Sequence, residues 1–184
     1  MFKVKLLHED SVTPTKAHED DSGWDMYAYD FKELYQGPAP EHKLVPDPET
    51  GMIPGCQSSR GLLTLNPMER VVIGTGIAGF VDFPEDVFHL PYGAKVLVEL
   101  QARPRSGNRR KEGLEVHFGT VDKPYRGEIC VIVTNLGHDA REIRVGDRIA
   151  QLVPTLVLKT TLKVVGELDG TVRGSSGFGD SGKR

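Results

Sequence analysis

The chain has 184 residues, with 23 lysines and arginines against 26 aspartates and glutamates, which gives a formal net charge of −3. This length favours one domain whose core forms without disulfides, and the slightly acidic balance argues against nucleic acid as a partner. Residues 1–6 alternate apolar and charged side chains without a signal-peptide core. No stretch approaches the roughly 18 apolar residues of a membrane helix. We therefore expect a cytoplasmic protein without membrane contact.

Short runs of alternating apolar and polar residues recur along the chain, a pattern typical of strands buried on one face. The predicted strands span residues 2–6, 24–29, 62–65, 70–73, 77–83, 95–103, 113–118, 128–135, 141–145 and 149–158. Between them lie many of the 21 glycines and 12 prolines, more than the usual combined share of about 12%. The pattern indicates an all-β sandwich or barrel, with residues 106–112 as the one candidate helix.

Three segments lie outside this strand pattern. Residues 36–61 are dense in turn signals and lack periodicity, so we interpret them as a long surface insertion; residues 84–93 form a smaller one. From Gly166 onward the apolar periodicity ceases, and the glycine- and serine-rich end is too polar to form a core of its own. We assign residues 1–170 to one β domain and residues 171–184 to a flexible C-terminal arm.

Several positions carry residue types suited to phosphate or water chemistry. Arg105 and Ser106 follow a predicted strand, where a guanidinium and free backbone N–H groups can bind an anion; a serine N-cap beside a solvated arginine is equally consistent. Asp122 lies at a turn, where aspartate usually satisfies its own backbone and becomes catalytic where a water must be deprotonated. Gln151 lies among apolar neighbours and needs a partner if it is buried.

Other observations concern the placement of side chains. Regular alternation predicts that Arg148 and Gln151 point to opposite faces of their strand. Cys130 lies in the apolar run 129–133, and we interpret it as a buried structural thiol. In the arm, Phe178 stands among closely spaced glycines. Such a composition suits either a loop that cradles phosphates and stacks on a base or a flexible linker.

In this order, the segments resemble the five sequence motifs of the homotrimeric deoxyuridine triphosphate nucleotidohydrolases, the dUTPase family. The motifs fall at residues 21–26, 104–107, 119–127, 146–152 and 173–182. The chain departs from the family pattern within three of them. Trp24 replaces the usual tyrosine, Lys123 and Pro124 replace an acidic pair, and Asp180 adds a negative charge to the arm.

The resemblance implies a distorted jelly-roll β-barrel and a homotrimer whose arm is exchanged between subunits, acting on dUTP with Mg²⁺ to give dUMP and pyrophosphate. It casts Asp122 as the base that activates water for attack on the α-phosphorus, and Asp25 as an outer-shell ligand of Mg²⁺ through water. A hairpin over residues 114–121 would read uracil, and Tyr125 would exclude a 2′-hydroxyl. The residues implied to bind substrate are Arg105, Ser106, Gly107, Gly119, Thr120, Val121, Tyr125, Gln151, Arg173, Phe178 and Gly179.

Two other functions fit the sequence. A deoxycytidine triphosphate deaminase of the same fold needs a catalytic glutamate, for which Glu115 is the candidate, and release of ammonia from dCTP would identify it. Alternatively, the protein is a dUTPase that also binds a regulatory protein partner through residues 36–61. In that case, deletion of residues 38–60 abolishes partner binding and leaves activity intact.

Overall fold

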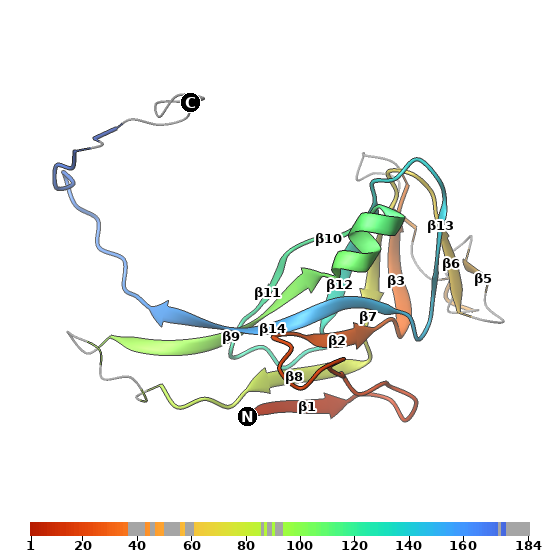
Figure 1. Cartoon of the computed structure of the whole chain (residues 1–184), viewed down its shortest axis with the longest axis horizontal. Helices are drawn as coiled ribbons and strands as arrows, with labels where there is room; N and C mark the ends of the chain where they lie inside the picture. The colour runs from red at the N-terminus through yellow and green to blue at the C-terminus, as the bar shows by residue number, and fades with distance from the viewer. Residues whose placement is uncertain are drawn as a thin grey trace.

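The computed structural model describes residues 1–36, 43–44, 47–49, 56–57, 61–85, 87, 90, 94–172 and 174–175. Strands dominate these ranges (Figure 1), which confirms the predicted all-β class. The strands are β1 (Phe2–Leu6), β2 (Trp24–Tyr27), β3 (Asp30–Tyr35), β4 (Lys43–Leu44), β5 (Cys56–Gln57), β6 (Leu62–Leu65), β7 (Arg70–Gly74), β8 (Ile77–Val81), β9 (Lys95–Pro104), β10 (Leu114–Val116), β11 (Gly119–Val121), β12 (Cys130–Asn135), β13 (Arg141–Arg144) and β14 (Arg148–Lys159). A short π-helix, η3 (Asn108–Glu112), occupies the predicted helical segment. No helix in these ranges has the length and apolar content needed to span a membrane.

Antiparallel pairing arranges the strands in four sheets. Their orders are β10-β12-β7-β3-β4, β11-β9-β14-β2, β13-β6-β5 and β1-β8. In Figure 1 the strands of the β11-β9-β14-β2 sheet run across the molecule, and those of the β10-β12-β7-β3-β4 sheet rise from them. Several antiparallel sheets around one core form the expected jelly-roll fold.

One apolar cluster joins these sheets. In β9, alternate residues from Val96 to Ala102 are buried, as a period of two predicts. Other strands contribute side chains that are at most 2% exposed, among them Val71, Ile73, Val131, Val133 and Leu152. Full burial of one such side chain contributes about 1.5–3 kcal/mol, so the cluster fixes the strands that carry the candidate site.

The structure corrects the prediction for Cys130. In β12, Val131 and Val133 face the core, while Cys130 and Ile132 lie on the other face and are exposed. A continuous apolar run predicts a strand that is buried on both faces. Because the chain covers β12 on one face, Cys130 is not a buried thiol.

The sequence did not predict the strand β3, because the spacing of its buried apolar residues is irregular. Phe31 and Leu34 are both buried although they are three residues apart, since the pairing with β7 shifts register between Phe31 and Glu33. The short strands β4 and β5 lie within the predicted insertion and pair with β3 and β6. The greater part of residues 36–61 lies outside the described residues.

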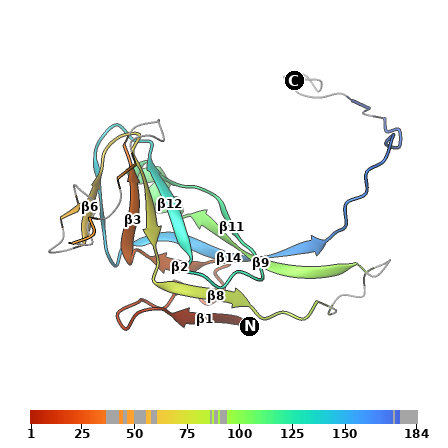
Figure 2. The same cartoon turned by 180° about the vertical axis from the view of Figure 1, so that it is seen from behind.

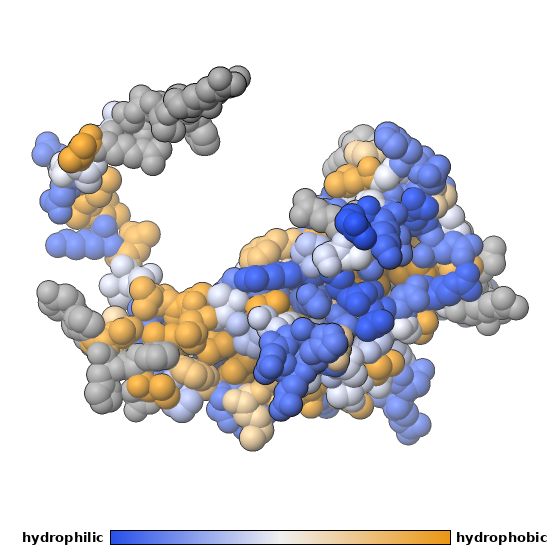
Figure 3. All heavy atoms as spheres, in the orientation of Figure 1, coloured by the Kyte–Doolittle hydropathy of each residue, from blue (hydrophilic) through white to orange (hydrophobic). Residues whose placement is uncertain are grey.

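The strands β9 and β14 form a long ribbon, from Ala150 opposite Pro104 to Lys159 opposite Lys95. One end of the ribbon lies in the core and the other projects from the body (Figures 1 and 2). Leu156 and Leu158, toward the projecting end, are 55% and 61% exposed, and Figure 3 shows hydrophobic residues gathered there. Residues 160–172 continue from this end with exposed side chains.

Candidate active site

A buried carboxylate organises one part of the site. Asp25, in β2, is 3% exposed. Its Oδ1 accepts hydrogen bonds from Arg105 Nε at 2.9 Å and Gln151 Nε2 at 3.2 Å, and its Oδ2 accepts one from Arg148 Nη1 at 3.3 Å. A buried carboxylate is tolerated only with such partners. We call these four residues the Asp25 cluster; it joins three predicted site residues and adds Arg148, which was not predicted as one.

A β-bulge brings both Arg148 and Gln151 to Asp25. The pairing of β14 with β2 shifts register between Arg148 and Ala150, which leaves Ile149 as an extra residue. In a regular strand, side chains three positions apart point to opposite faces. The bulge cancels this, so the regular alternation predicted from the sequence is wrong here. In the structure the bulge is marked by burial of two consecutive residues, Ile149 and Ala150. A periodic sequence pattern does not predict such a pair.

The turn after β9 carries the second predicted group. Ser106 and Gly107 are exposed, and the N-cap position of η3 is Gly107, so Ser106 is not the N-cap considered from the sequence. Asn108 Nδ2 donates to Arg148 O at 3.1 Å and ties η3 to β14. A cavity of about 450 Å³ opens at this turn, lined by Pro104, Arg105, Ser106 and Arg110.

Residues 122–125, which we call the Asp122 turn, follow β11. Asp122 is exposed, and its carbonyl accepts a hydrogen bond from Tyr125 N at 2.9 Å. Tyr125 is 46% exposed, and its hydroxyl donates to Glu128 O at 2.9 Å. A Cβ added at Gly127 would lie 2.6 Å from Tyr125 Cζ. A side chain at position 127 would therefore displace the Tyr125 ring, which lies against this glycine.

Residues 114–121 do not form the predicted hairpin. The strand β10 pairs with β12, and β11 pairs with β9, so the segment passes from one sheet to another at His117 and Phe118. Three of the predicted substrate-binding residues make up β11, where Gly119, Thr120 and Val121 lie opposite Ala102, Gln101 and Leu100. The segment thus presents its backbone beside β9 and ends directly at Asp122.

Within one chain, the Asp122 turn and the Asp25 cluster are apart. Val121 pairs with Leu100, whereas Gln151 pairs with Arg103 on the other edge of β9. Among the residues that the structure describes, no hydrogen bond or ion pair joins the two groups. The predicted arm residues Arg173, Phe178 and Gly179 lie outside the described residues.

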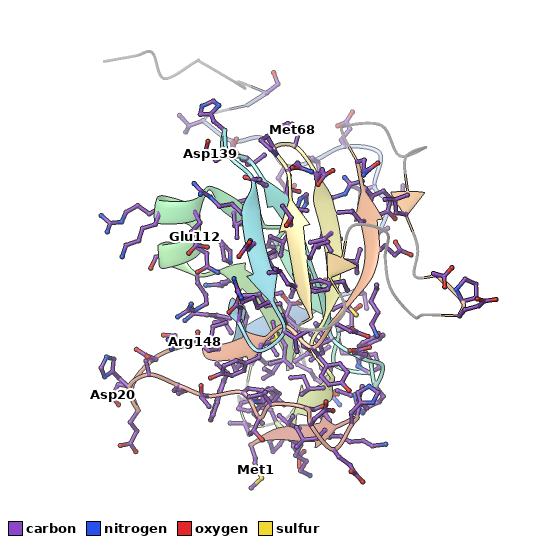
Figure 4. All side chains as sticks on the ribbon, turned by 90° about the vertical axis from the view of Figure 1, so that its right-hand side faces the viewer. Met1, Asp20, Met68, Glu112, Asp139 and Arg148 are labelled. Carbon is purple, nitrogen blue, oxygen red and sulfur yellow. The ribbon has the colours of Figure 1, made fainter. Side chains whose placement is uncertain are left out.

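The side chains give no ready-made metal cage. In the described part of the chain, no three His, Cys, Asp or Glu residues are grouped so that they could hold an ion. Arg148, which contacts Asp25, lies between Met1 and Asp139 along the molecule in Figure 4.

The chain is similar in sequence to known proteins of one family. The dUTPase family model matches residues 91–182. A deoxyuridine 5′-triphosphate nucleotidohydrolase of Nautilia profundicola is 41% identical over 184 residues, which are 99% of each chain. The protein of that name from Clostridium novyi is 34% identical over 183 residues, 97% of this chain and 96% of that one.

Solved structures support the fold. A mutant dUTPase of Staphylococcus bacteriophage 80alpha with dUpNHpp is similar with a TM-score of 0.69 and 22% identity, over 99% of this chain and 98% of that chain. The dUTPase of phage phi11 of S. aureus gives a TM-score of 0.61 at 20% identity, over 93% and 99%. Because the sequence relatives match nearly the whole chain and the family model matches its C-terminal half, the chain belongs to the dUTPase family.

Proposed function

We propose that the chain hydrolyses dUTP to dUMP and pyrophosphate, with the triphosphate bound between the Asp25 cluster and the turn after β9. One observation carries the proposal: a single buried carboxylate holds two guanidinium groups and an amide beside an exposed serine and glycine. One carboxylate against two arginines leaves a net positive charge, which suits a polyphosphate. Asp25 engages Arg105 through Nε, and Arg105 Nη1 donates to Arg148 O at 3.4 Å, so Nη2 is the nitrogen proposed to bind the phosphate.

Gly107 supports a ligand at this turn. Its backbone has φ −63° and ψ −50°, a conformation that any residue adopts. A Cβ added there would meet nothing within 4 Å. At position 107, neither the backbone conformation nor the packing within the chain requires glycine. Close approach of a phosphate to the backbone N–H would favour it. The Ser106 hydroxyl adds a donor beside it.

Asp122 is the proposed general base. Its exposed carboxylate would take a proton from a water whose oxygen attacks the α-phosphorus, and the bond from that phosphorus to the bridging oxygen of pyrophosphate would break. The Tyr125 ring is proposed to pack under the deoxyribose and to leave no room for a 2′-hydroxyl. The backbone of residues 119–121 is proposed to bind uracil, with a donor and an acceptor that cytosine would leave mismatched.

Mg²⁺ fits this site as an ion carried by the triphosphate. Asp25 Oδ2 accepts one hydrogen bond, from Arg148, and a carboxylate oxygen can accept a second, here from a water of the hydrated ion. Asp25 is therefore the proposed outer-shell ligand. The ion would supply charge neutralisation on the phosphate oxygens.

We further propose that the active unit is a homotrimer with shared sites. The separation of the Asp122 turn from the Asp25 cluster supports a site completed between subunits. The exposed apolar end of the β9–β14 ribbon, which includes Leu156 and Leu158, supports an assembly surface there. Residues 171–184 are proposed as an arm that closes a neighbouring site through Arg173, Phe178 and Gly179. A docking role for residues 36–61 and the cytoplasmic location stay predictions from the sequence.

The test compares pyrophosphate release from dUTP, dCTP, dTTP and UTP. We expect dUTP to be strongly preferred, whereas ammonia released from dCTP would indicate the deaminase instead. Asp122→Asn keeps the size and one acceptor oxygen but cannot accept a proton at neutral pH. We expect it to lower kcat by about a hundredfold while KM changes by less than about threefold.

Asp139→Asn is the matched control. The Asp139 side chain is 80% exposed, and Figure 4 shows it toward the end of the molecule opposite Met1. Its substitution should leave both constants unchanged. If Asp122→Asn turned over dUTP within about threefold of the parent, another group would have to be the base.

A further inference from the structure

Lys123, the residue after Asp122, forms an ion pair with Glu85 in the insertion between β8 and β9. Lys123 Nζ donates to Glu85 Oε1 at 2.9 Å. The two side chains are 26% and 30% exposed, so solvent covers the contact only in part. The pair involves the residue bonded directly to Asp122.

Glu85 is itself well anchored. Its carbonyl accepts a hydrogen bond from Val96 N at 3.5 Å, at the start of β9. Its Oε2 has two further cations nearby, Lys159 Nζ at 3.8 Å and Lys95 Nζ at 3.9 Å. The hydrogen bond from Lys123, followed by the charges of the three lysines, holds the pKa of the Glu85 carboxyl below its ordinary value. Glu85 thus stays a carboxylate at neutral pH and offers a fixed partner.

The far side of the turn is held by a second contact. Arg126 Nη1 donates to Lys123 O at 2.6 Å and to Tyr125 O at 2.7 Å. The guanidinium lies 3.8 Å from the centre of the Phe80 ring, in β8. Arg126 therefore fixes the carbonyls of the turn, whereas the Lys123 side chain fixes the end that carries Asp122.

The turn needs such external contacts because of its sequence. Asp122 and Tyr125 are its first and fourth residues, which puts Pro124 third. Proline disfavours the α region for the residue before it, and that region is what the commonest turn requires at the second position. Proline therefore works against the commonest turn at Lys123, and the side-chain contacts help to hold the turn that forms.

We propose that Glu85 and Lys123 are positioning residues, which hold the Asp122 turn in the orientation that catalysis needs. The pair also keeps the Lys123 ammonium off Asp122, its chain neighbour, with which an unpaired lysine could form a competing contact. The proposal rests on the proposed role of Asp122 as the base. Partly exposed ion pairs add little to stability, so loss of the pair should change turnover and leave the fold intact.

The test measures kcat and KM for dUTP in Lys123→Met, Lys123→Arg, Glu85→Gln and the Lys123→Met/Glu85→Gln double variant. Lys123→Met should lower kcat by roughly three- to tenfold, less than the hundredfold that a 1 Å displacement of a reacting group can cost, with KM within about twofold. Lys123→Arg should restore kcat because a guanidinium can still reach Glu85. The kcat of the double variant should be no lower than that of the less active of the two single variants.

Two comparisons separate positioning from a general structural effect. Lys159→Met removes a cation from the same carboxylate without touching the turn and should leave kcat unchanged. In the Asp122→Asn background, Lys123→Met should have no further effect, because it acts through Asp122.

A kcat for Lys123→Met within about 1.5-fold of the parent, or a full further loss in the Asp122→Asn background, would overturn the proposal. Parental turnover by Asp122→Asn would instead refute the role of Asp122 itself.

Discussion

Substitution of Asp25 by asparagine should destabilise the protein even without nucleotide or metal, because the carboxylate is a structural centre. Asparagine keeps an oxygen that can accept from Arg105 Nε and Gln151 Nε2, whose bonds to Oδ1 measure 2.9 and 3.2 Å. Its amide group then replaces Oδ2 and meets Arg148 Nη1, donor against donor. The charge is lost from both guanidinium contacts.

The size of the effect follows from the exposure of the partners. A hydrogen bond to a charged group contributes about 1.5–3 kcal/mol and a neutral one about 0.5–1.5 kcal/mol, so the Arg105 contact, whose side chain is 23% exposed, should lose about 1 kcal/mol. The Arg148 side chain is 48% exposed, and its contact is screened to about 0.5 kcal/mol or less. Adding the mismatch with the new amide gives about 1–2 kcal/mol in the free energy of unfolding, or roughly 2–8 °C in Tm for a chain of this length.

Thermal melting at fixed subunit concentration measures this shift, with Glu142→Gln as the control. Glu142 pairs with Arg144, and both side chains are about half exposed, so the control should lower Tm by no more than about 2 °C. The reasoning fails if Asp25→Asn melts within about 1 °C of the parent. In activity, Asp25→Asn should raise KM for dUTP by about three- to tenfold. If excess Mg²⁺ restored the parental KM, Asp25 would act on the metal and not through Arg105.

Three further predictions test other parts of the molecule. Gly127→Ala should displace the Tyr125 ring and lower the ratio of kcat/KM for dUTP over UTP, and an unchanged ratio would contradict the proposed exclusion of a 2′-hydroxyl. Leu158→Asp should dissociate the proposed trimer, as measured by light scattering, and abolish turnover; full activity as a monomer would refute the proposed shared sites. Although Cys130 is exposed as a residue, the protein around its sulfur removes part of the thiol's water shell, and this desolvation, with the nearby Glu128 carboxylate, raises the pKa of Cys130 to about 11 from 9.0. The shift favours the neutral thiol in the folded state. In a Cys56→Ser background, alkylation by iodoacetamide at pH 9 should therefore be slow in the native protein and fast in urea, and equal rates would contradict the shift.

The sequence predicted the fold class because most strands are buried on one face. In β9, alternate residues from Val96 to Ala102 enter the core, and this alternation is visible in the chain itself. The strand β3 was missed because its bulge puts the buried Phe31 and Leu34 at odd spacing. Cys130 was misplaced because an apolar run does not reveal that only one of its two faces meets the core.

The candidate site could be predicted only as separate motifs. Asp25, Arg105 and Gln151 stand far apart in the chain, and pairing of β14 with β2 and β9 is what brings them together. Their partner Arg148 depends on a register shift that no local pattern encodes. The Glu85–Lys123 pair likewise joins an insertion to a turn, and a surface lysine and glutamate carry no signal of such pairing.

The bulge in β14 places two site residues on one face although they stand three positions apart. Ile149 and Ala150 are buried at 3% and 0%, so other apolar side chains of similar volume should be accepted at both positions. Removal of either residue would leave Arg148 and Gln151 two positions apart in an unbroken ladder, where side chains share a face. At this point the gene should therefore tolerate a single-codon deletion as well as apolar substitutions.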